Sequence, residues 1–306
     1  MKANRTFVLI TRKTRLQELV ERFNSWSQAK FYLEHNQIDV SDYIDENEVY
    51  QSKLKQAEIT LRKLGRFQLI EREMLTNYQF GTDDIVVVIG QDGLVANTLK
   101  YLNGQPVIAI NPDPCRWDGK LLPFEVSDLT SVVKDVLEGK LTSRFISFAQ
   151  VSTNDGQLLR GVNDLFIGPK SHTSARYTLR WKGEEESQSS SGIIVSTGLG
   201  STGWFQSILA GAMGVGGLNA HPLQGGFDWD AKRLQFAVRE PFPSQTSSVK
   251  TVFGAITPDT PLTLESLMPE NGVIFSDGIE QDFIQFNAGT IATVSLDDRQ
   301  GQLVSN

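Results

Sequence analysis

Short, almost uninterrupted apolar runs alternate with stretches of helical spacing over the first 140 or so residues of this 306-residue chain. The apolar runs are Phe7–Thr11, Phe67–Ile70, Ile85–Ile89 and Pro106–Asn111. Strands without polar alternation are typical of a parallel sheet that is covered by helices on both faces. The first part of the chain is therefore expected to form an α/β domain with a Rossmann-like parallel sheet.

Apolar residues three or four positions apart lie between these runs and predict helices. The predicted helices cover Leu16–Leu33, Asn47–Leu64, Leu94–Leu102 and Leu129–Leu137, and the last one stops at Gly139. Glycine is common directly after a helix because it adopts the left-handed conformation without strain. We expect the α/β domain to end close to this glycine.

The pattern changes beyond residue 141, where strand-like runs follow one another with Gly, Pro, Asn and Asp turns between them. Residues 154–156 and 277–278 carry hairpin signals. The serine-rich stretch EEESQSSSG is interpreted as an exposed hairpin loop. These features predict a mostly β domain over residues 142–306, after an α/β domain over residues 1–141. The expected strands are Arg144–Val151, Leu158–Ile167, Tyr177–Lys182, Gly192–Thr197, Arg233–Arg239, Pro261–Leu267, Gly272–Phe275 and Thr290–Leu296.

Composition limits the possible classes of function. Hydrophobic residues make up 40% and charged residues 21% of the chain, as in an ordinary soluble protein. The net charge of −7 argues against nucleic-acid and membrane-surface partners, which select a basic surface. No apolar run approaches the roughly 18 residues of a membrane span, and the N-terminus lacks the pattern of a signal peptide. We expect a soluble, cytoplasmic protein that acts on small molecules.

Metal sites built from cysteine or histidine are not expected. Cys115 is the single cysteine, which excludes an internal disulfide and a cysteine-based zinc site. The three histidines, His35, His172 and His221, do not show the paired spacing of metal ligands.

A glycine turn, Gly90-Gln91-Asp92-Gly93, follows the apolar run Ile85–Ile89 and precedes a helix-like stretch. Backbone N–H groups at such a strand-to-helix turn bind anions such as phosphate. Phosphate repels Asp92 unless a cation intervenes or the carboxylate accepts a proton from an attacking hydroxyl. Both roles belong to phosphoryl transfer. The alternative is that Asp92 is only a turn or N-cap residue.

A second glycine-rich segment, STGLGSTGW, spans Ser196–Trp204. Its Gly198, Gly200 and Gly203 match G-x-G-x-x-G, but no βαβ unit surrounds it and the acidic residue expected about 20 positions later is missing. Trp204 stands where a Walker loop has lysine. Small residues let a nucleotide approach the backbone, and a tryptophan can stack on a base. The alternative is a turn with Trp204 in the core.

Asn163 and Asp164 interrupt the apolar stretch GVNDLFIGP. Buried polar side chains need partners. An adjacent Asn-Asp pair can offer donors and acceptors to a base or a ribose. The alternative is a bulge or a turn at a sheet edge.

Taken in this order, the three motifs resemble those of the NAD kinase family. The family has Gly-Gly-Asp-Gly, Asn-Glu and Ser-Thr-Pro-Thr-Gly-Ser-Thr-Ala-Tyr, where this chain has GQDG, ND and STGLGSTGW. The segments INPDPCRWDGKLLPF and SDGIEQDFIQFNAGTIATVSL are similar to the divergent branch that includes the mitochondrial-type NAD kinases. The resemblance covers roughly residues 85–300 and implies the fold shared by NAD kinases and diacylglycerol kinases.

The resemblance implies a kinase that transfers a phosphoryl group from ATP, or from polyphosphate, to the 2′-hydroxyl of the adenosine ribose of NAD, giving NADP. Asp92 would be the catalytic base of this reaction. Family members use Mg²⁺, for which no ligand residue can be named here because substrate phosphates can hold much of it. They are homo-oligomers, so a homodimer is expected.

The same resemblance implies which residues bind the nucleotides. Two glycines would shape the phosphate loop, a polar pair would hold the adenosine, and three residues of the second glycine-rich segment would line its adenine side. These residues are Gly90 and Gly93, Asn163 and Asp164, and Thr202, Gly203 and Trp204.

Three departures from the family pattern bear on activity. Gln91 replaces the second glycine, and a left-handed conformation there would cost this side chain about 1 kcal/mol. Leu94 replaces the usual threonine and so removes a hydroxyl donor. Asp164 is one methylene shorter than glutamate. The first two changes fall on the donor-phosphate side.

Two alternatives to an NAD kinase stay open. In the first, the altered loop has lost the donor site, and the chain is a non-catalytic, regulatory dinucleotide-binding protein. In the second, it is a kinase of a sugar or lipid alcohol. Lipid kinases of the diacylglycerol type share the Gly-Asp-Gly turn, but they lack the Asn-Asp pair and the Ser-Thr-Gly loop.

Overall fold

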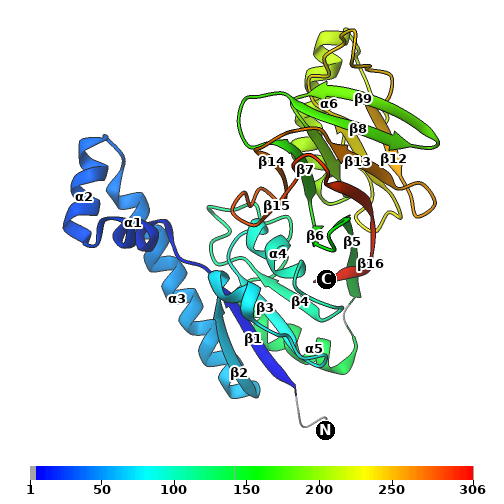
Figure 1. The fold of residues 1–306 in the computed structure, drawn as a ribbon. Helices are drawn as coiled ribbons and strands as arrows, with labels where there is room; N and C mark the ends of the chain where they lie inside the picture. Colours follow the sequence, from blue (N-terminus) through cyan, green and yellow to red (C-terminus); the bar gives the residue numbers. More distant parts are fainter. Residues whose placement is uncertain (1–4, 141, 306) are drawn as a thin grey trace. The chain divides into compact units, whose positions relative to one another are not determined.

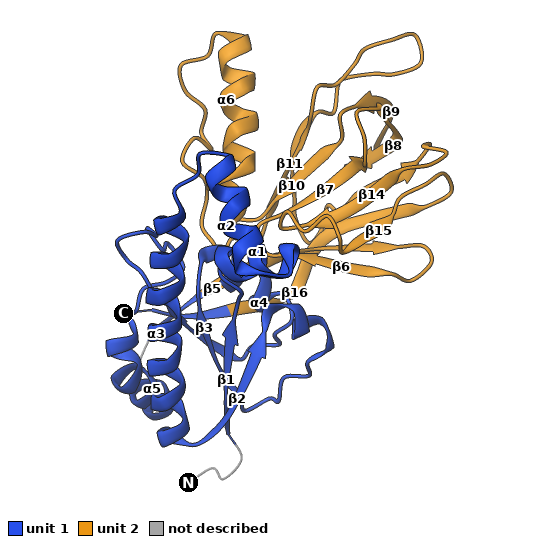
Figure 2. Cartoon of the chain, turned by 90° about the vertical axis from the view of Figure 1, so that its left-hand side faces the viewer, with its two compact units in different colours: residues 1–144, 302–306 blue, residues 145–301 orange. Residues whose placement is uncertain are grey.

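The computed structural model, drawn in Figure 1, describes residues 5–140 and 142–305. The chain divides into two compact units, which Figure 2 shows in different colours. Unit 1 comprises Met1–Arg144 and Gln302–Asn306, and unit 2 comprises Phe145–Gly301. The last residues thus belong to unit 1, whereas the sequence-based division places them in the second domain.

Unit 1 is built around a parallel sheet with the strand order β2-β1-β3-β4. The end of the C-terminal strand β16 joins it by parallel pairing with β4 at two residues. The prediction of an α/β domain with a parallel sheet is confirmed, because the four apolar runs form strands of this sheet. β1, β3 and β4 are buried almost throughout, whereas the edge strand β2 is largely exposed. The strands of the sheet are β1 (Thr6–Thr11), β2 (Arg66–Glu71), β3 (Ile85–Ile89), β4 (Pro106–Ile110) and the end of β16 (Ile291–Ser305).

The helices of unit 1 lie between its strands in the sequence. Residues of α3 and α5 pack with the strands in one core cluster. The last helix ends at Gly139 in the left-handed conformation, with φ 69°, as predicted. The helices are α1 (Arg15–Phe23), α2 (Trp26–His35), α3 (Val40–Leu64), α4 (Asp92–Leu99) and α5 (Leu129–Glu138), with the 3₁₀ turns η1 (Arg72–Asn77) and η2 (Val126–Asp128).

The prediction of one helix over Leu16–Leu33 is wrong, because α1 and α2 are separate. Asn24 ends α1 in the left-handed conformation, with φ 57°. Ser25 then caps α2, and its side chain accepts a hydrogen bond from the Gln28 N–H. Asparagine and serine favour such caps over helix interiors, and this local chemistry overrides the apolar spacing.

Unit 2 contains two packed sheets, with a core formed by the inner faces of both. One is an antiparallel six-stranded sheet with the order β12-β11-β10-β7-β14-β15. Its strands are β7 (Asp164–Pro169), β10 (Ile193–Ser196), β11 (Leu234–Val238), β12 (Phe253–Ile256), β14 (Gly272–Ser276) and β15 (Phe283–Gln285). The other contains β5 (Thr142–Thr153), β6 (Leu158–Gly161), β8 (Ala175–Trp181), β9 (Glu184–Ser190), β13 (Leu262–Ser266) and part of β16.

The outer face of the six-stranded sheet carries the helix α6 (Trp204–Gly216), which follows the 3₁₀ turn η3 (Gly200–Thr202). Trp204 and Ile208 of α6 pack on a small apolar cluster of Phe166, Ile194, Val273 and Phe275. The second glycine-rich segment therefore lies on the outer face of the sheet that contains β7, the strand that begins with Asp164.

Two sequence predictions for unit 2 are wrong. The serine-rich stretch is a strand, β9, paired with β8 along its whole length rather than an exposed loop. Its inward side chains are polar but satisfied, since the Tyr177 hydroxyl bonds both Gln188 and Ser190. The predicted strand Leu158–Ile167 is two strands, β6 and β7, with Val162 and Asn163 between them. Both predicted hairpins, at 154–156 and 277–278, are confirmed.

Candidate functional site

The glycine turn of unit 1 lies between the end of β3 and the first residue of α4, which is Asp92. Gln91 is the N-cap residue and has φ −120° and ψ 163°, an extended conformation that any residue adopts. The strain considered for Gln91 therefore does not arise. A Cβ on Gly90 would lie 2.9 Å from Leu94 Cδ2, whereas a Cβ on Gly93 would meet nothing within 4 Å.

The Asp92 carboxylate is held in place by backbone donors of a distant turn. Its Oδ1 accepts a hydrogen bond of 2.8 Å from the Leu121 N–H, and its Oδ2 accepts one of 3.2 Å from the Lys120 N–H. Asp92 is half-buried and lies in the first turn of α4, where the helix dipole favours a negative charge. Each oxygen keeps a lone pair, so the fixed carboxylate can accept a further hydrogen bond or a proton.

Three arginines of unit 1 lie close together, but neighbouring carboxylates already pair with them. Arg12 follows β1 and donates to Glu46 at 3.0 Å, and Arg15 also pairs with Glu46. Arg116 donates to Asp42 at 2.5 Å. These pairs leave this cluster with little net positive charge, so it does not by itself form an anion site.

In unit 2, the Asn163-Asp164 segment is fixed by Asp277, from the turn between β14 and β15. The Asp277 carboxylate accepts hydrogen bonds from the N–H groups of Val162 at 2.9 Å, Asn163 at 2.6 Å and Asp164 at 3.4 Å. The Asp277 N–H in turn donates to the Asp164 carbonyl at 3.1 Å. Three consecutive amides thus point at one carboxylate, which explains why the strand breaks at this point.

The second glycine-rich segment holds the same residues by their carbonyl groups. The Thr197 hydroxyl donates to the Val162 carbonyl at 2.6 Å, and the Thr197 N–H donates to the Asn163 carbonyl at 2.9 Å. Gly200 lies so close that an added Cβ would be 2.0 Å from the Asn163 oxygen. The structure therefore brings together three segments that are far apart in the sequence: 162–164, 197–200 and 277–278.

The Asp164 carboxyl group is buried beside a second acid. Burial, and secondly the charge of Asp277, raises the pKa of Asp164 from 3.8 to about 7. Within residues 5–140 and 142–305, its side chain makes no hydrogen bond. Since a polar group at this depth needs a partner, the carboxyl is suited to a hydroxyl or amino group of a ligand.

The Asp164→Asn variant is expected to change how stability depends on pH. In the wild type, the unfolded chain ionises Asp164 near pH 4 while the folded protein keeps the proton until about pH 7. The free energy of unfolding of the wild type therefore falls as pH rises between these values, by on the order of 4 kcal/mol. Asparagine removes this loss, so urea titrations should show the variant gaining stability over the wild type from pH 4 to pH 8. A constant difference across this range would contradict the assignment.

Replacing Asp277 by alanine is expected to destabilise unit 2 by about 3 kcal/mol, because three partly buried N–H groups lose their acceptor. Asp277 has φ 56°, a conformation that asparagine tolerates and alanine does not. Asp277→Asn keeps one acceptor oxygen and the backbone, so it should lose clearly less. Equal losses of unfolding free energy for the two variants in urea would show that the carboxylate does not act as described.

The remaining predicted nucleotide-binding residues lie where η3 passes into α6. Thr202 and Gly203 are exposed, and Trp204 is half-buried. The Trp204 ring is parallel to Phe166, with 5.8 Å between centroids, and the Arg239 guanidinium lies over it at 5.4 Å. Part of this ring therefore packs on the protein, as the core alternative suggested.

Sequence reasoning missed the residues that organise this site. The Asp277-Gly278 pair predicts only a hairpin, and the pattern of the Ser196–Trp204 segment does not single out Thr197 as the residue that holds Val162 and Asn163. A hairpin signal does not show what the carboxylate of its aspartate bonds. The contact with Asn163 spans 114 positions, so only the folded chain reveals it.

Comparison with known proteins shows which solved structures have a similar fold. No protein-family model matches the sequence, and no curated protein matches it either. Among the solved structures that are similar to this chain, two kinases match it over nearly its whole length. An NAD kinase from Archaeoglobus fulgidus in complex with ATP has a TM-score of 0.59 and 17% identity, covering 99% of this chain and 94% of that one. Yeast NADH kinase complexed with NADH has a TM-score of 0.62 and 15% identity, covering 100% and 84%.

The likeness agrees with the arrangement of the described residues, namely an α/β unit and a mostly antiparallel β unit. None of the helices in the described ranges has the length and apolar character needed to cross a membrane. The likeness to the mitochondrial-type branch stays a prediction. The chain has the fold of the NAD and NADH kinases.

Proposed function

We propose that this protein is an NAD kinase-like phosphotransferase. It would transfer the terminal phosphoryl group of ATP, or of polyphosphate, to the 2′-hydroxyl of the adenosine ribose of NAD. The observation that carries the proposal is the meeting of three segments in unit 2, where Asp277 and Thr197 fix Asn163 and Asp164. The fold is similar to that of an NAD kinase solved in complex with ATP and of an NADH kinase solved with NADH.

The residues of the glycine turn would carry out the phosphoryl transfer. Asp92 would accept the proton of the 2′-hydroxyl group of the ribose. The 2′-oxygen would form the new P–O bond while the bond between the transferred phosphorus and the rest of the donor breaks. The two backbone hydrogen bonds to Asp92 fix its carboxylate but leave lone pairs free. Gly90 and Gly93 would shape the phosphate loop. A Cβ on Gly93 would meet no atom within 4 Å, so there is open space next to this residue.

The acceptor would be held by unit 2. Asn163 and Asp164 would bind its adenosine, with the protonated Asp164 carboxyl able to donate a hydrogen bond to a ribose hydroxyl near pH 7. Thr202, Gly203 and Trp204 would line the adenine side. Thr202 and Gly203 are exposed and therefore accessible to a ligand.

We also propose that Mg²⁺ takes part, that the protein works as a homodimer, and that it is cytoplasmic. Mg²⁺ would neutralise charge on the transferred phosphoryl group. Among the described residues, no three His, Cys, Asp or Glu side chains gather as a ready-made metal site. Much of the coordination would therefore come from phosphates and water, as is usual for nucleotide-bound Mg²⁺. Loss of turnover on adding a chelator, restored by excess Mg²⁺, tests this part.

The position of the new phosphate distinguishes this function from other kinases of the same fold. A dehydrogenase that accepts only NADP detects the 2′-phosphate. After the protein has been incubated with NAD and a phosphoryl donor, this dehydrogenase should reduce the newly formed NADP to NADPH. Stabilisation of the protein by a sugar or a lipid but not by NAD would favour a kinase of another alcohol.

One observation favours the alternative of a dinucleotide-binding protein without catalysis. The buried Leu94 side chain, 3% exposed, lies against the position of a Gly90 Cβ and offers no hydroxyl to a phosphate. Calorimetry that detects NAD binding, without ATP binding and without turnover, would select this alternative.

A further inference from the structure

A pocket of about 300 Å³ opens on the outer side of the six-stranded sheet of unit 2. Its floor is apolar and aromatic: Phe166 comes from β7, and Val273 and Phe275 come from β14. All three are less than 9% exposed. Trp204 forms one wall. Such a floor accommodates a flat ring, because offset and edge-to-face contacts between aromatic rings are favourable.

Cationic side chains border the same pocket and are paired with carboxylates weakly or not at all. Arg239 lies over the Trp204 ring, and its nearest ion pair is a long contact of 3.8 Å with Glu240, whose side chain is 68% exposed. The Lys170 ammonium lies 4.8 Å from the centroid of Phe283. Within the described residues, Lys170 makes no ion pair and the Arg239 guanidinium makes no hydrogen bond. Both are therefore available to an anion.

We propose that this pocket binds one mononucleotide unit. The base would lie on the Phe166 and Phe275 floor, and the phosphate would contact Arg239 and Lys170. A guanidinium can bind two phosphate oxygens at once, and an ammonium adds a point charge. The volume is at the lower end for small-molecule sites, which fits a mononucleotide and not a whole dinucleotide.

The polar residues on the rim refine this ligand class. Ser171 and His172 are exposed and lie next to Lys170 in the chain, so they offer further donors. Glu280 is the one carboxylate among the lining residues, and it can accept a hydrogen bond from an amino group of a base or a carboxamide. The pocket thus combines an aromatic floor with both kinds of polar partner that a nucleotide requires.

Such a unit has two sources: a free mononucleotide, or one half of a dinucleotide bound elsewhere in unit 2. Trp204 is also proposed to line the adenine side of the phosphoryl acceptor, whereas Phe166, Lys170 and Arg239 are not among the residues proposed for that acceptor. The pocket can therefore be tested without any phosphoryl donor, and its failure is distinguishable from the failure of the proposed reaction.

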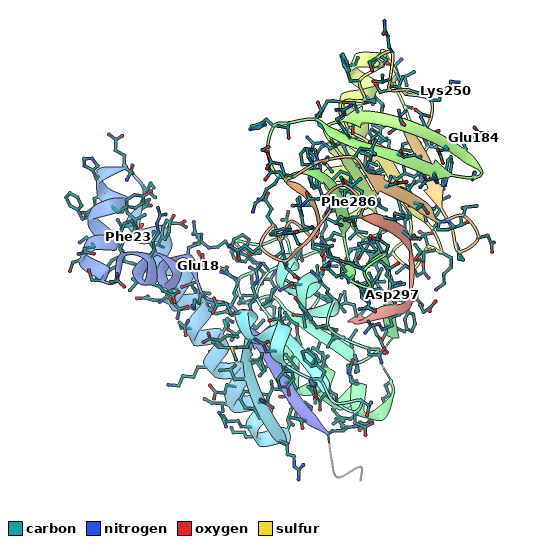
Figure 3. All side chains as sticks on the ribbon, in the orientation of Figure 1. Glu18, Phe23, Glu184, Lys250, Phe286 and Asp297 are labelled. Atoms are coloured by element: carbon teal, nitrogen blue, oxygen red, sulfur yellow. The ribbon has the colours of Figure 1, made fainter. Side chains whose placement is uncertain are left out.

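The test measures binding of AMP, nicotinamide mononucleotide, adenosine, inorganic phosphate and NAD by calorimetry. The wild type should bind at least one mononucleotide more tightly than adenosine or phosphate alone. The double variant Lys170→Gln with Arg239→Gln should weaken this binding tenfold or more, with little effect on adenosine. Lys250→Gln is the matched control, because Lys250, labelled in Figure 3, is a lysine of unit 2 outside the pocket lining.

Thermal unfolding of each variant shows whether the fold is intact. Competition then identifies the source. If NAD displaces the mononucleotide one for one, and the double variant also weakens NAD, the pocket holds half of a dinucleotide. If both bind together, it holds a free mononucleotide. The proposal is overturned if the wild type binds no mononucleotide at millimolar concentration, or if the double variant binds it unchanged while folded.

Discussion

The Asp92→Asn variant is expected to lower kcat for phosphoryl transfer to NAD by about 10²- to 10⁴-fold, with little change in KM. Asparagine has nearly the shape of aspartate but cannot accept the proton of the attacking hydroxyl, and the loss of a general base costs this range. The measurement is steady-state formation of NADP by the wild type and the variant at several pH values. A variant with full kcat would remove Asp92 from the chemistry.

The local structure should survive this substitution. The asparagine oxygen can keep the 2.8 Å bond from the Leu121 N–H, so only the weaker contact with Lys120 is lost. The expected cost is about 1 kcal/mol of unfolding free energy. Asp83→Asn is a suitable control, because this exposed carboxylate lies just before the other end of β3. It removes one charge and should leave kcat unchanged.

Gly200→Ala should abolish dinucleotide binding and destabilise unit 2 by about 3 kcal/mol or more. The added Cβ would lie 2.0 Å from the Asn163 carbonyl oxygen and 2.5 Å from the Asn163 carbonyl carbon. Neither backbone atom can move freely, since Thr197 and Asp277 bond the same segment. Overpacking of a fixed backbone is costly. Urea unfolding and NAD calorimetry measure both effects.

Gly211→Ala provides the comparison. Gly211 lies within α6, and a Cβ there would meet nothing within 4 Å. Alanine should therefore leave binding intact and stabilise the helix by up to about 1 kcal/mol. Similar losses in both variants, or normal NAD binding by Gly200→Ala, would contradict the close packing of Gly200 on Asn163.

Much of the fold was predictable because burial leaves a clear pattern. Ile85–Ile89 has no polar residue, and all five side chains are buried in a central parallel strand. Predictions were wrong where side-chain hydrogen bonds override that pattern. Asn24 and Ser25 end one helix and start the next, and β9 buries Gln188 and Ser190 because Tyr177 satisfies them. Polarity alone therefore suggested a loop where a strand exists.

The candidate site was only partly predictable. The short motifs identified Asn163, Asp164 and the Ser196–Trp204 segment, because polar and glycine residues stand out within apolar stretches. The sequence could not show that Asp277 accepts hydrogen bonds from three amides more than 110 positions away. Nor could it show that Gln91 is extended, which removes the strain considered for it.

If this chain is an NAD kinase, the purified protein converts NAD to NADP when a phosphoryl donor is present. The most direct measurement incubates the purified protein with NAD and Mg²⁺, separately with ATP and with polyphosphate, and detects NADP by chromatography and by an NADP-specific dehydrogenase. Asp92→Asn, checked for folding, is the matched control. We expect NADP with at least one donor from the wild type and at least about 100-fold less from the variant. The absence of NADP from reactions of the folded wild type with either donor would show that the chain is not an NAD kinase.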